Sequence, residues 1–346
     1  MSSAIDQSSI MPAKKASYVT DNRLWLVIFI VALAGLPFAL PGYWIFFAGL
    51  LGINIIASHG LNIMMGYTGL LSLGHGAFVG VGAYTVAILQ TNFDLPFWIT
   101  IPLAGIIATV IGIAFGLPSL RIRGLYLVIA TLAAQFILYF IFVHWESVTN
   151  SDVGLSVAPA EIFGYQFNTE TRIYYFILAF VIASTIFARN VIRSRVGRAF
   201  IAIRERDLTA QVLGVEIVWY KLLSFGLGSF YAGIAGALLA YFNRFVNPEQ
   251  FELMLSVFFL SAVIVGGMGS ILGAILGAVF VTLLPEFLRE ASLLAAHGLG
   301  IDLSSILTPL RETIFGLIIV GFLILEPRGL AHLWQRARRK FSRARA

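Results

Sequence analysis

The chain has no cysteine, and only 12% of its 346 residues are Asp, Glu, Lys or Arg. The missing thiols exclude disulfides, thiolate metal sites and cysteine nucleophiles. Hydrophobic residues make up 59% of the chain, whereas soluble domains average about 45–50% apolar and about 25% charged residues. A chain of this composition cannot cover itself with polar surface. The composition therefore excludes a soluble enzyme and a disordered protein.

The sequence also lacks the residue patterns of common catalytic and metal sites. None of its lysines follows a glycine, so there is no phosphate-binding loop of the nucleotide-hydrolase type. Its five histidines lack zinc-ligand spacing. Almost no ionisable residue falls inside the apolar runs, where a proton- or sodium-coupled carrier usually keeps one. We therefore expect no enzyme, no cofactor and no metal, but a transporter that receives its energy from another protein.

The sequence contains long runs without Asp, Glu, Lys or Arg. No charged residue lies between Arg23 and Asp94, and one helix of that length would reach about 105 Å, against about 30 Å for a bilayer core. The run must therefore fold back, as helices, because lipid offers the backbone no hydrogen-bond partner. The spans predicted along the chain are Leu24–Leu40, Trp44–Met65, Leu70–Thr91 and the runs 95–120, 124–145, 173–188, 222–243, 253–285 and 313–325.

The run 253–285 is too long for one crossing, and Gly266–Ser270 in its middle predicts a break. Counting it twice gives about ten transmembrane helices. The predicted fold class is therefore an all-α, polytopic integral membrane protein with Gly-rich broken helices.

The basic residues predict the orientation of these spans. With ten spans, one side holds 19 of the 23 lysines and arginines, and the other side holds only Arg172, Arg244, Arg289 and Arg311. Because short cytoplasmic loops carry the excess of Lys and Arg, both termini are predicted to be cytoplasmic. This distribution follows membrane topology and argues against nucleic acid as a partner, despite the formal charge of +6.

Three parts of the chain follow from this orientation. Residues 1–23 form a cytoplasmic N-terminal segment, 24–330 a transmembrane permease domain, and 331–346 a basic cytoplasmic tail. The loop 189–221 faces the cytoplasm and 144–172 faces outward. A cleaved signal peptide is the competing interpretation of the N-terminus, but no small-residue cleavage site follows its apolar run.

Two of the spans follow turns rich in glycine. The turn Gly66–Gly69 precedes a helix with Gly76 and Gly80, and the turn Gly266–Gly269 precedes one with Gly273 and Gly277. Small residues four apart let helix backbones approach closely in lipid, so these four glycines are predicted helix-packing positions. A second interpretation is that broken helices beside them line a transport path, because irregular backbone at membrane depth is tolerated only inside protein or facing a cavity.

Polar residues gather near the first of these turns. The predicted translocation path contains Asn62, Thr68, Ser72 and His75. Asn62 also continues a stripe with Asn54 and Ser58, four residues apart on one helix face. Polar side chains inside a membrane usually face protein or water, so hydrogen bonding between helices is the alternative to a pathway lining.

The loop 189–221 combines basic charge with an apolar periodicity. Ile201, Leu208, Val212 and Val215 would share one face of an amphipathic helix over Ala202–Val215, and Gly214 would end it. A solvated basic loop is the simpler interpretation. The periodicity favours a docking helix for a cytoplasmic partner.

Several stretches together resemble the permease subunit of branched-chain amino acid ATP-binding-cassette (ABC) transporters, of the LivM-like type. The matching stretches are Gly60–Asn62 leading into Gly66–Phe78, Arg123–Leu132, the loop 189–221, and Gly266–Gly273. The resemblance covers roughly residues 44–330. It implies a translocation path without an ATPase of its own, paired with a second permease subunit, two cytoplasmic ATPase subunits and a periplasmic substrate-binding protein. It also implies a bacterial inner membrane and branched-chain or other amino acids as substrate.

The family's loop carries a coupling motif of Glu-Ala-Ala, three residues and Gly. The aligned residues are Leu208, Thr209, Ala210 and Gly214, of which Ala210 and Gly214 match. The predicted ATPase-coupling residues are Arg204, Glu205 and Asp207, whose charges can pair with a partner, and Ala210 and Gly214, which match the motif. By the resemblance, Asp207 would substitute for the missing glutamate. A urea or short-amide importer of the same family and a stand-alone channel remain alternatives.

Overall fold

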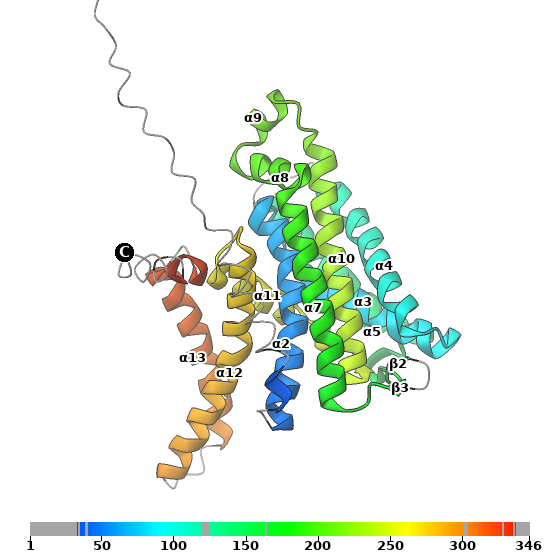
Figure 1. Ribbon diagram of the computed structural model, residues 1–346, viewed down its shortest axis with the longest axis vertical. Helices are drawn as coiled ribbons and strands as arrows, with labels where there is room; N and C mark the ends of the chain where they lie inside the picture. The colour runs from blue at the N-terminus through cyan, green and yellow to red at the C-terminus, as the bar shows by residue number, and fades with distance from the viewer. Residues whose placement is uncertain are drawn as a thin grey trace, which may run out of the picture.

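The protein is described by a computed structural model in residues 33, 35–38, 41–119, 125–162, 165–299, 304–326, 329–334 and 336. These residues form a bundle of long helices with a few two-residue strands at one end (Figure 1). In this part of the chain, seven helices are long and apolar enough to cross a membrane: Gly42–Tyr67, Phe97–Pro118, Tyr126–His144, Glu170–Arg193, Ile217–Asn243, Pro248–Gly266 and Ile271–Ala291. The predicted all-α, polytopic membrane fold is confirmed.

Every predicted span after the first corresponds to one helix of the bundle. The long helices are α2 (Gly42–Leu61), continued by the π-helix η2 (Asn62–Tyr67), α3 (His75–Phe93), α4 (Phe97–Ser119), α5 (Leu125–His144), α7 (Glu170–Arg193), α10 (Ile217–Asn243), α11 (Leu253–Gly266), α12 (Ile271–Leu299) and α13 (Ser304–Leu325). The predicted first span, Leu24–Leu40, lies largely outside the described residues. The run 253–285 breaks where the glycines predict it, between α11 and α12.

Two predicted boundaries are wrong. The span expected from Leu70 begins only at His75, because residues 68–74 are non-helical and bond instead to side chains of other helices. The loop expected over 189–221 is shorter, because α7 runs on to Arg193 and α10 already begins at Ile217. Arg189 and Arg193 therefore belong to the end of α7, and Lys221 belongs to the start of α10. The connecting segment is therefore 194–216, which we call loop 194–216.

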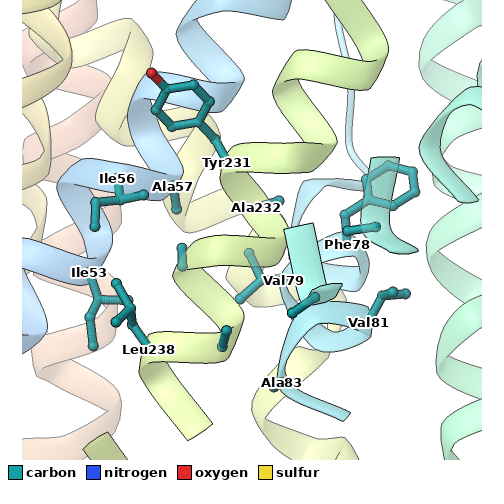
Figure 2. Close-up of a cluster of buried hydrophobic side chains, with 14 of the residues drawn as sticks. Ile53, Ile56, Ala57, Phe78, Val79, Val81, Ala83, Tyr231, Ala232 and Leu238 are labelled. Carbon is teal, nitrogen blue, oxygen red and sulfur yellow. The ribbon is translucent and has the colours of Figure 1, made fainter. Parts of the chain in front are cut away.

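Helix α10 lies at the centre of the bundle and packs against α4, α3 and α2. Small residues allow this approach: a Cβ added to Gly236 of α10 would overlap the carbonyl oxygen of Val79 in α3. Figure 2 shows the resulting core, formed by Ile53, Ile56 and Ala57 of α2, Phe78, Val79, Val81 and Ala83 of α3, and Tyr231, Ala232 and Leu238 of α10. In lipid such backbone contact supplies the packing that holds helices together.

The connecting elements lie at opposite ends of the bundle (Figure 1). One end carries α8 (Arg195–Glu205) and α9 (Asp207–Val212). The other carries α6 (Glu146–Thr149), η3 (Ser151–Val153), β1 (Leu155–Ser156), β2 (Glu161–Ile162), β3 (Tyr165–Gln166), β4 (Phe245–Val246) and η4 (Pro248–Phe251). There β1 pairs antiparallel with β4, and Arg244 donates to the carbonyl oxygen of Asn168 at 2.7 Å. The segments predicted to face opposite sides of the membrane thus lie at opposite ends.

Candidate functional site

The two helix breaks that the glycines predict meet each other inside the protein. Asn62, at the start of η2, accepts a hydrogen bond from the Gly269 backbone N–H at 2.9 Å and donates to the Ser270 carbonyl oxygen at 3.0 Å. One side-chain amide therefore joins both breaks, although they are some 200 residues apart in the sequence. Gly69 has φ +79° and Gly269 has φ +77°, values in the left-handed region that glycine adopts without steric cost.

The polar side chains of the non-helical segment 68–74, Thr68 and Ser72, are buried and bonded within the chain, whereas Gly69 and Leu71 are exposed. The Thr68 hydroxyl bonds to the Ile63 carbonyl oxygen at 3.1 Å and to the Ser224 hydroxyl at 2.8 Å. Ser72 accepts from the Gly74 N–H at 3.3 Å, and the Leu73 N–H donates to Thr131 at 3.0 Å. Irregular backbone at this depth is stable because protein groups replace the missing helical bonds.

The four predicted path residues are all inaccessible in this conformation of the single subunit. Asn62, Thr68, Ser72 and His75 are between 0% and 2% exposed. His75 bonds through Nε2 to the Ala57 carbonyl oxygen at 2.9 Å, while its Nδ1 has no hydrogen-bond partner among the described residues. Of the remaining stripe, Asn54 donates to Thr282 of α12 at 3.0 Å. Asn54 and Asn62 of the stripe therefore bond to other helices and to the second break, whereas the Ser58 hydroxyl has no partner among the described residues. A pathway role for the four path residues stays a prediction.

The sequence analysis missed a polar network at the first turn of α3. The Gly76 N–H donates to Ser256 of α11 at 2.8 Å, and the Ala77 N–H donates to Gln135 of α5 at 2.9 Å. Ser256 in turn donates to Gln135 at 2.9 Å, and Gln135 donates to the Phe251 carbonyl oxygen at 2.7 Å. These bonds satisfy N–H groups that a helix start leaves free. The available signal was a few polar residues inside each apolar run, such as Thr131 and Gln135 in 124–145 and Ser256 and Ser261 in 253–285.

The four predicted packing glycines lie where another element approaches closely, at Gly80 with aromatic side chains and at the other three with backbone atoms among the neighbours. A Cβ on Gly76 would lie 2.9 Å from the Ser256 hydroxyl, and one on Gly80 would lie 2.7 Å from the Phe142 ring. A Cβ on Gly273 or Gly277 would overlap the carbonyl oxygen of Gly267 or Ala262, respectively. At each position a larger side chain would force neighbouring atoms to move.

Loop 194–216 contains two helices, so the single amphipathic helix predicted over Ala202–Val215 is wrong. Arg206 is extended, with φ −159° and ψ 108°, and separates α8 from α9. The four residues expected on one face accordingly do not share one: Ile201 lies on α8, Leu208 and Val212 on α9, and Val215 beyond α9. Leu208 and Val212 are exposed. The buried residues of the two helices are Gly197, Ala199, Phe200, Ile203 and Ala210.

Two of the predicted coupling charges bond to groups of the membrane helices. The Arg204 guanidinium donates to the carbonyl oxygen of Gly66 in η2. Asp207 pairs with Lys221 of α10 at 2.7 Å, and the Lys221 side chain is only 10% exposed. Glu205 lies beside it at the end of α8, and both Arg204 and Glu205 are exposed. Arg204 and Asp207 therefore fix the loop to the helices, and Glu205 remains available at the surface.

Gly214 ends α9 as predicted. It has φ +83°, its N–H donates to the Gln211 carbonyl oxygen at 3.0 Å, and the Val215 N–H donates to the Ala210 carbonyl oxygen at 3.0 Å. This pair of bonds is the Schellman arrangement, in which glycine takes the left-handed position. The turn borders a surface hollow of about 550 Å³, lined by Gln211, Gly214, Val215, Glu216, Ile217, Val218, Trp219 and Leu222.

Together these features define a class of protein: a multi-pass membrane protein whose buried broken helices are bonded directly to a polar loop at one end of the bundle. Discontinuous helices of this kind are typical of transporters. The family model of the branched-chain amino acid transport system / permease component matches residues 43–323. The chain belongs to this family.

Individual relatives agree with the family match. The chain is 33% identical to the high-affinity branched-chain amino acid transport system permease protein LivM of Salmonella typhimurium (strain LT2), over 84% of this chain and 74% of the relative. It is 34% identical to LivM of Escherichia coli (strain K12) over the same shares. A probable permease protein LivH of Methanocaldococcus jannaschii is 24% identical over 83% of this chain and 91% of its own length. No solved structure matches this chain.

Proposed function

We propose that the chain is the permease subunit of an ABC importer for branched-chain amino acids. The observation that carries this proposal is the family match over 43–323, which includes both helix breaks and loop 194–216. The relatives at 33% and 34% identity are named as branched-chain amino acid permeases. The subunit transports without catalysis of its own, and separate ATPase subunits supply the energy.

The surface beside Gly214 is the proposed docking site for an ATPase subunit. Large apolar side chains are exposed around the hollow: Leu208 is 68%, Val212 87%, Leu213 75%, Val218 59% and Trp219 60% exposed. The two residues that match the family's coupling motif lie here. Ala210 is the buried residue of α9, and Gly214 lines the hollow. An exposed apolar patch on a polar loop at the end of a membrane bundle is typical of a protein interface.

The remaining assembly follows the family. The chain pairs with a second permease subunit, two cytoplasmic ATPase subunits and a periplasmic substrate-binding protein, in a bacterial inner membrane. Loop 194–216 and both termini face the cytoplasm, which the 19 basic residues on that side support. The translocation path passes the breaks at Asn62, Thr68, Ser72 and His75. The free Nδ1 of His75 supports a path there, because a buried polar atom without a partner costs about 1–3 kcal/mol.

Uptake by the complete transporter tests this function. The chain, its sibling permease and the ATPase subunits are reconstituted in vesicles with the binding protein, and labelled leucine and urea are offered separately. We expect ATP-dependent uptake of leucine that is lost when either permease is omitted. ATP-dependent uptake of urea but not of leucine would favour the short-amide importer. Leucine flux through this chain alone, without ATP, would instead indicate a channel.

A further inference from the structure

Helices α2 and α12 are tied together by polar contacts along most of their length. At one end, Tyr43 donates to Glu286 and accepts from Arg289 at 2.5 Å, and Arg289 Nε donates to Glu286 at 2.8 Å. In the middle, Asn54 bonds to Thr282 at 3.0 Å. At the other end, Asn62 bonds to the two backbone groups at Gly269 and Ser270 that were described above.

These three ties span nearly the whole membrane. At 1.5 Å per residue, Tyr43 and Asn62 are about 28 Å apart along α2, and Ser270 and Glu286 are about 24 Å apart along α12. The hydrocarbon core of a bilayer is about 30 Å thick. Helix α2 is therefore held to α12 at both of its ends and near its centre, and it cannot tilt independently of the α12 segment up to Arg289 without breaking a polar bond.

Arg204 of α8 is seated on one end of this helix pair, where α8 lies over the end of α2 (Figure 1). Its guanidinium donates to the Gly66 carbonyl oxygen, which belongs to η2. The same guanidinium fills the space beside the second break, because a Cβ on Gly269 would lie 2.5 Å from Arg204 Nη1. The stem of Arg204 packs at Gly69, where a Cβ would lie 3.4 Å from its Cγ. A Cβ on Gly269 would therefore displace this guanidinium, whereas at Gly69 the φ of +79° is what favours glycine.

The helix that carries Arg204 is itself fixed. Phe200 and Ile203 of α8 are 0% and 3% exposed, so their side chains hold this helix in place. Arg204 lies on the same helix, and a movement of loop 194–216 that carries α8 therefore carries Arg204 with it. Arginine suits this place because its planar, permanently charged fork supplies several donors in fixed directions, whereas lysine is a flexible point charge.

We propose that Arg204 is the positioning residue that connects loop 194–216 to a rigid pair formed by α2 and α12. This inference rests on the proposed function, and it adds the contact and the moving element through which the energy passes. Displacement of the loop by the ATPase subunits moves Gly66 and Gly269 together. Because the pair is tied along its length, the displacement also reaches the Tyr43–Glu286 end, on the opposite side of the membrane. Arg204 touches neither ATPase nor substrate in this role.

Arg204→Met, studied in the complete reconstituted transporter, tests the inference. Arg206→Met is the matched control, because it removes the same charge from an exposed residue two positions away. Two quantities are measured: ATP hydrolysed per leucine imported, and the distance between spin labels at Phe287→Cys on α12 and Trp98→Cys on α4, with and without trapped ATP. Both labelled positions are exposed, at 63% and 50%.

In the wild-type background we expect the label distance to change with ATP. In Arg204→Met we expect that change to disappear while ATP hydrolysis continues, and the ATP used per leucine to rise about tenfold, as for the loss of one hydrogen bond to a charged group. Arg206→Met keeps the wild-type ratio and distance change. If Arg204→Met does not assemble, Arg204→Lys takes its place and must raise the ratio in the same direction.

A wild-type ratio and distance change in an assembled Arg204 variant would overturn the inference. Failure of the proposed function gives a different result, because the wild-type transporter would then import no leucine with ATP at all.

Discussion

At the scale of single residues, the stability of the bundle depends on a few polar side chains that replace missing backbone bonds. Ser256 is the clearest case, because its hydroxyl accepts from the Gly76 N–H and donates to Gln135 at the start of α3. All three groups are buried. In an interior without water, an N–H group that loses its acceptor keeps the full cost of desolvation.

Ser256→Ala should therefore lower the free energy of unfolding by about 1–3 kcal/mol, because it leaves the Gly76 N–H unbonded. Ser261→Ala on the same helix is the control, with an expected change within about 0.5 kcal/mol. The measurement is thermal unfolding of the purified subunit in detergent. Equal stability of the two variants would show that the network around Gln135 contributes nothing to holding α3.

Single residues also show where sequence reasoning stops. Asn62 could be recognised as a polar residue beside a glycine turn, but its partners at Gly269 and Ser270 are distant in the sequence and became visible only in the fold. Arg204 is a predicted ATPase-coupling residue, and although it is exposed, its guanidinium bonds to the Gly66 carbonyl oxygen at the break. A charged or polar residue in the sequence predicts that its side chain has a bonding partner, but the identity of that partner depends on the fold.

At the scale of helices, charge-free runs predicted most spans, because burial in lipid excludes charge over a fixed length. They could not predict that α3 starts at His75, since residues 70–74 are as apolar as the helix and their backbone is satisfied by Thr131 and Ser72. The break between α8 and α9 at Arg206 could not be predicted either. The apolar periodicity runs through it, but the Asp207–Lys221 pair ties the start of α9 to α10.

The end of α9 carries the prediction at this scale. Gly214→Trp should uncouple ATP hydrolysis from leucine uptake, because it places a large side chain on the rim of the hollow proposed for ATPase docking. Gly214→Ala is the matched control: its Cβ has no neighbour within 4 Å, and the left-handed φ of +83° costs alanine only about 1–2 kcal/mol. Uptake per ATP is measured for both. A Trp variant that couples as well as the Ala variant would place the docking surface elsewhere.

At the scale of the whole molecule, loop 194–216 and the end that carries the β1–β4 strand pair lie at opposite ends of one bundle (Figure 1). The proposed function requires the first end in the cytoplasm against ATPase subunits and the second outside. The sequence predicted this arrangement from the uneven distribution of lysines and arginines, because their excess in short loops can be counted without knowing how the helices pack. The pairing of helices within the bundle depends on close backbone contacts, such as Gly236 with Val79, which no local pattern reveals.

Cysteine chemistry tests this central claim most directly, because the chain contains no cysteine of its own. One cysteine is introduced at Leu213, which is 75% exposed beside the hollow, and another, in a separate variant, at Val153, which is 73% exposed at the opposite end. We expect Leu213→Cys to cross-link to an ATPase subunit in the assembled transporter and to resist an impermeant thiol reagent added to intact cells, while Val153→Cys reacts with that reagent. Labelling of Leu213→Cys from outside, with cross-linking to the ATPase at Val153→Cys, would contradict the account.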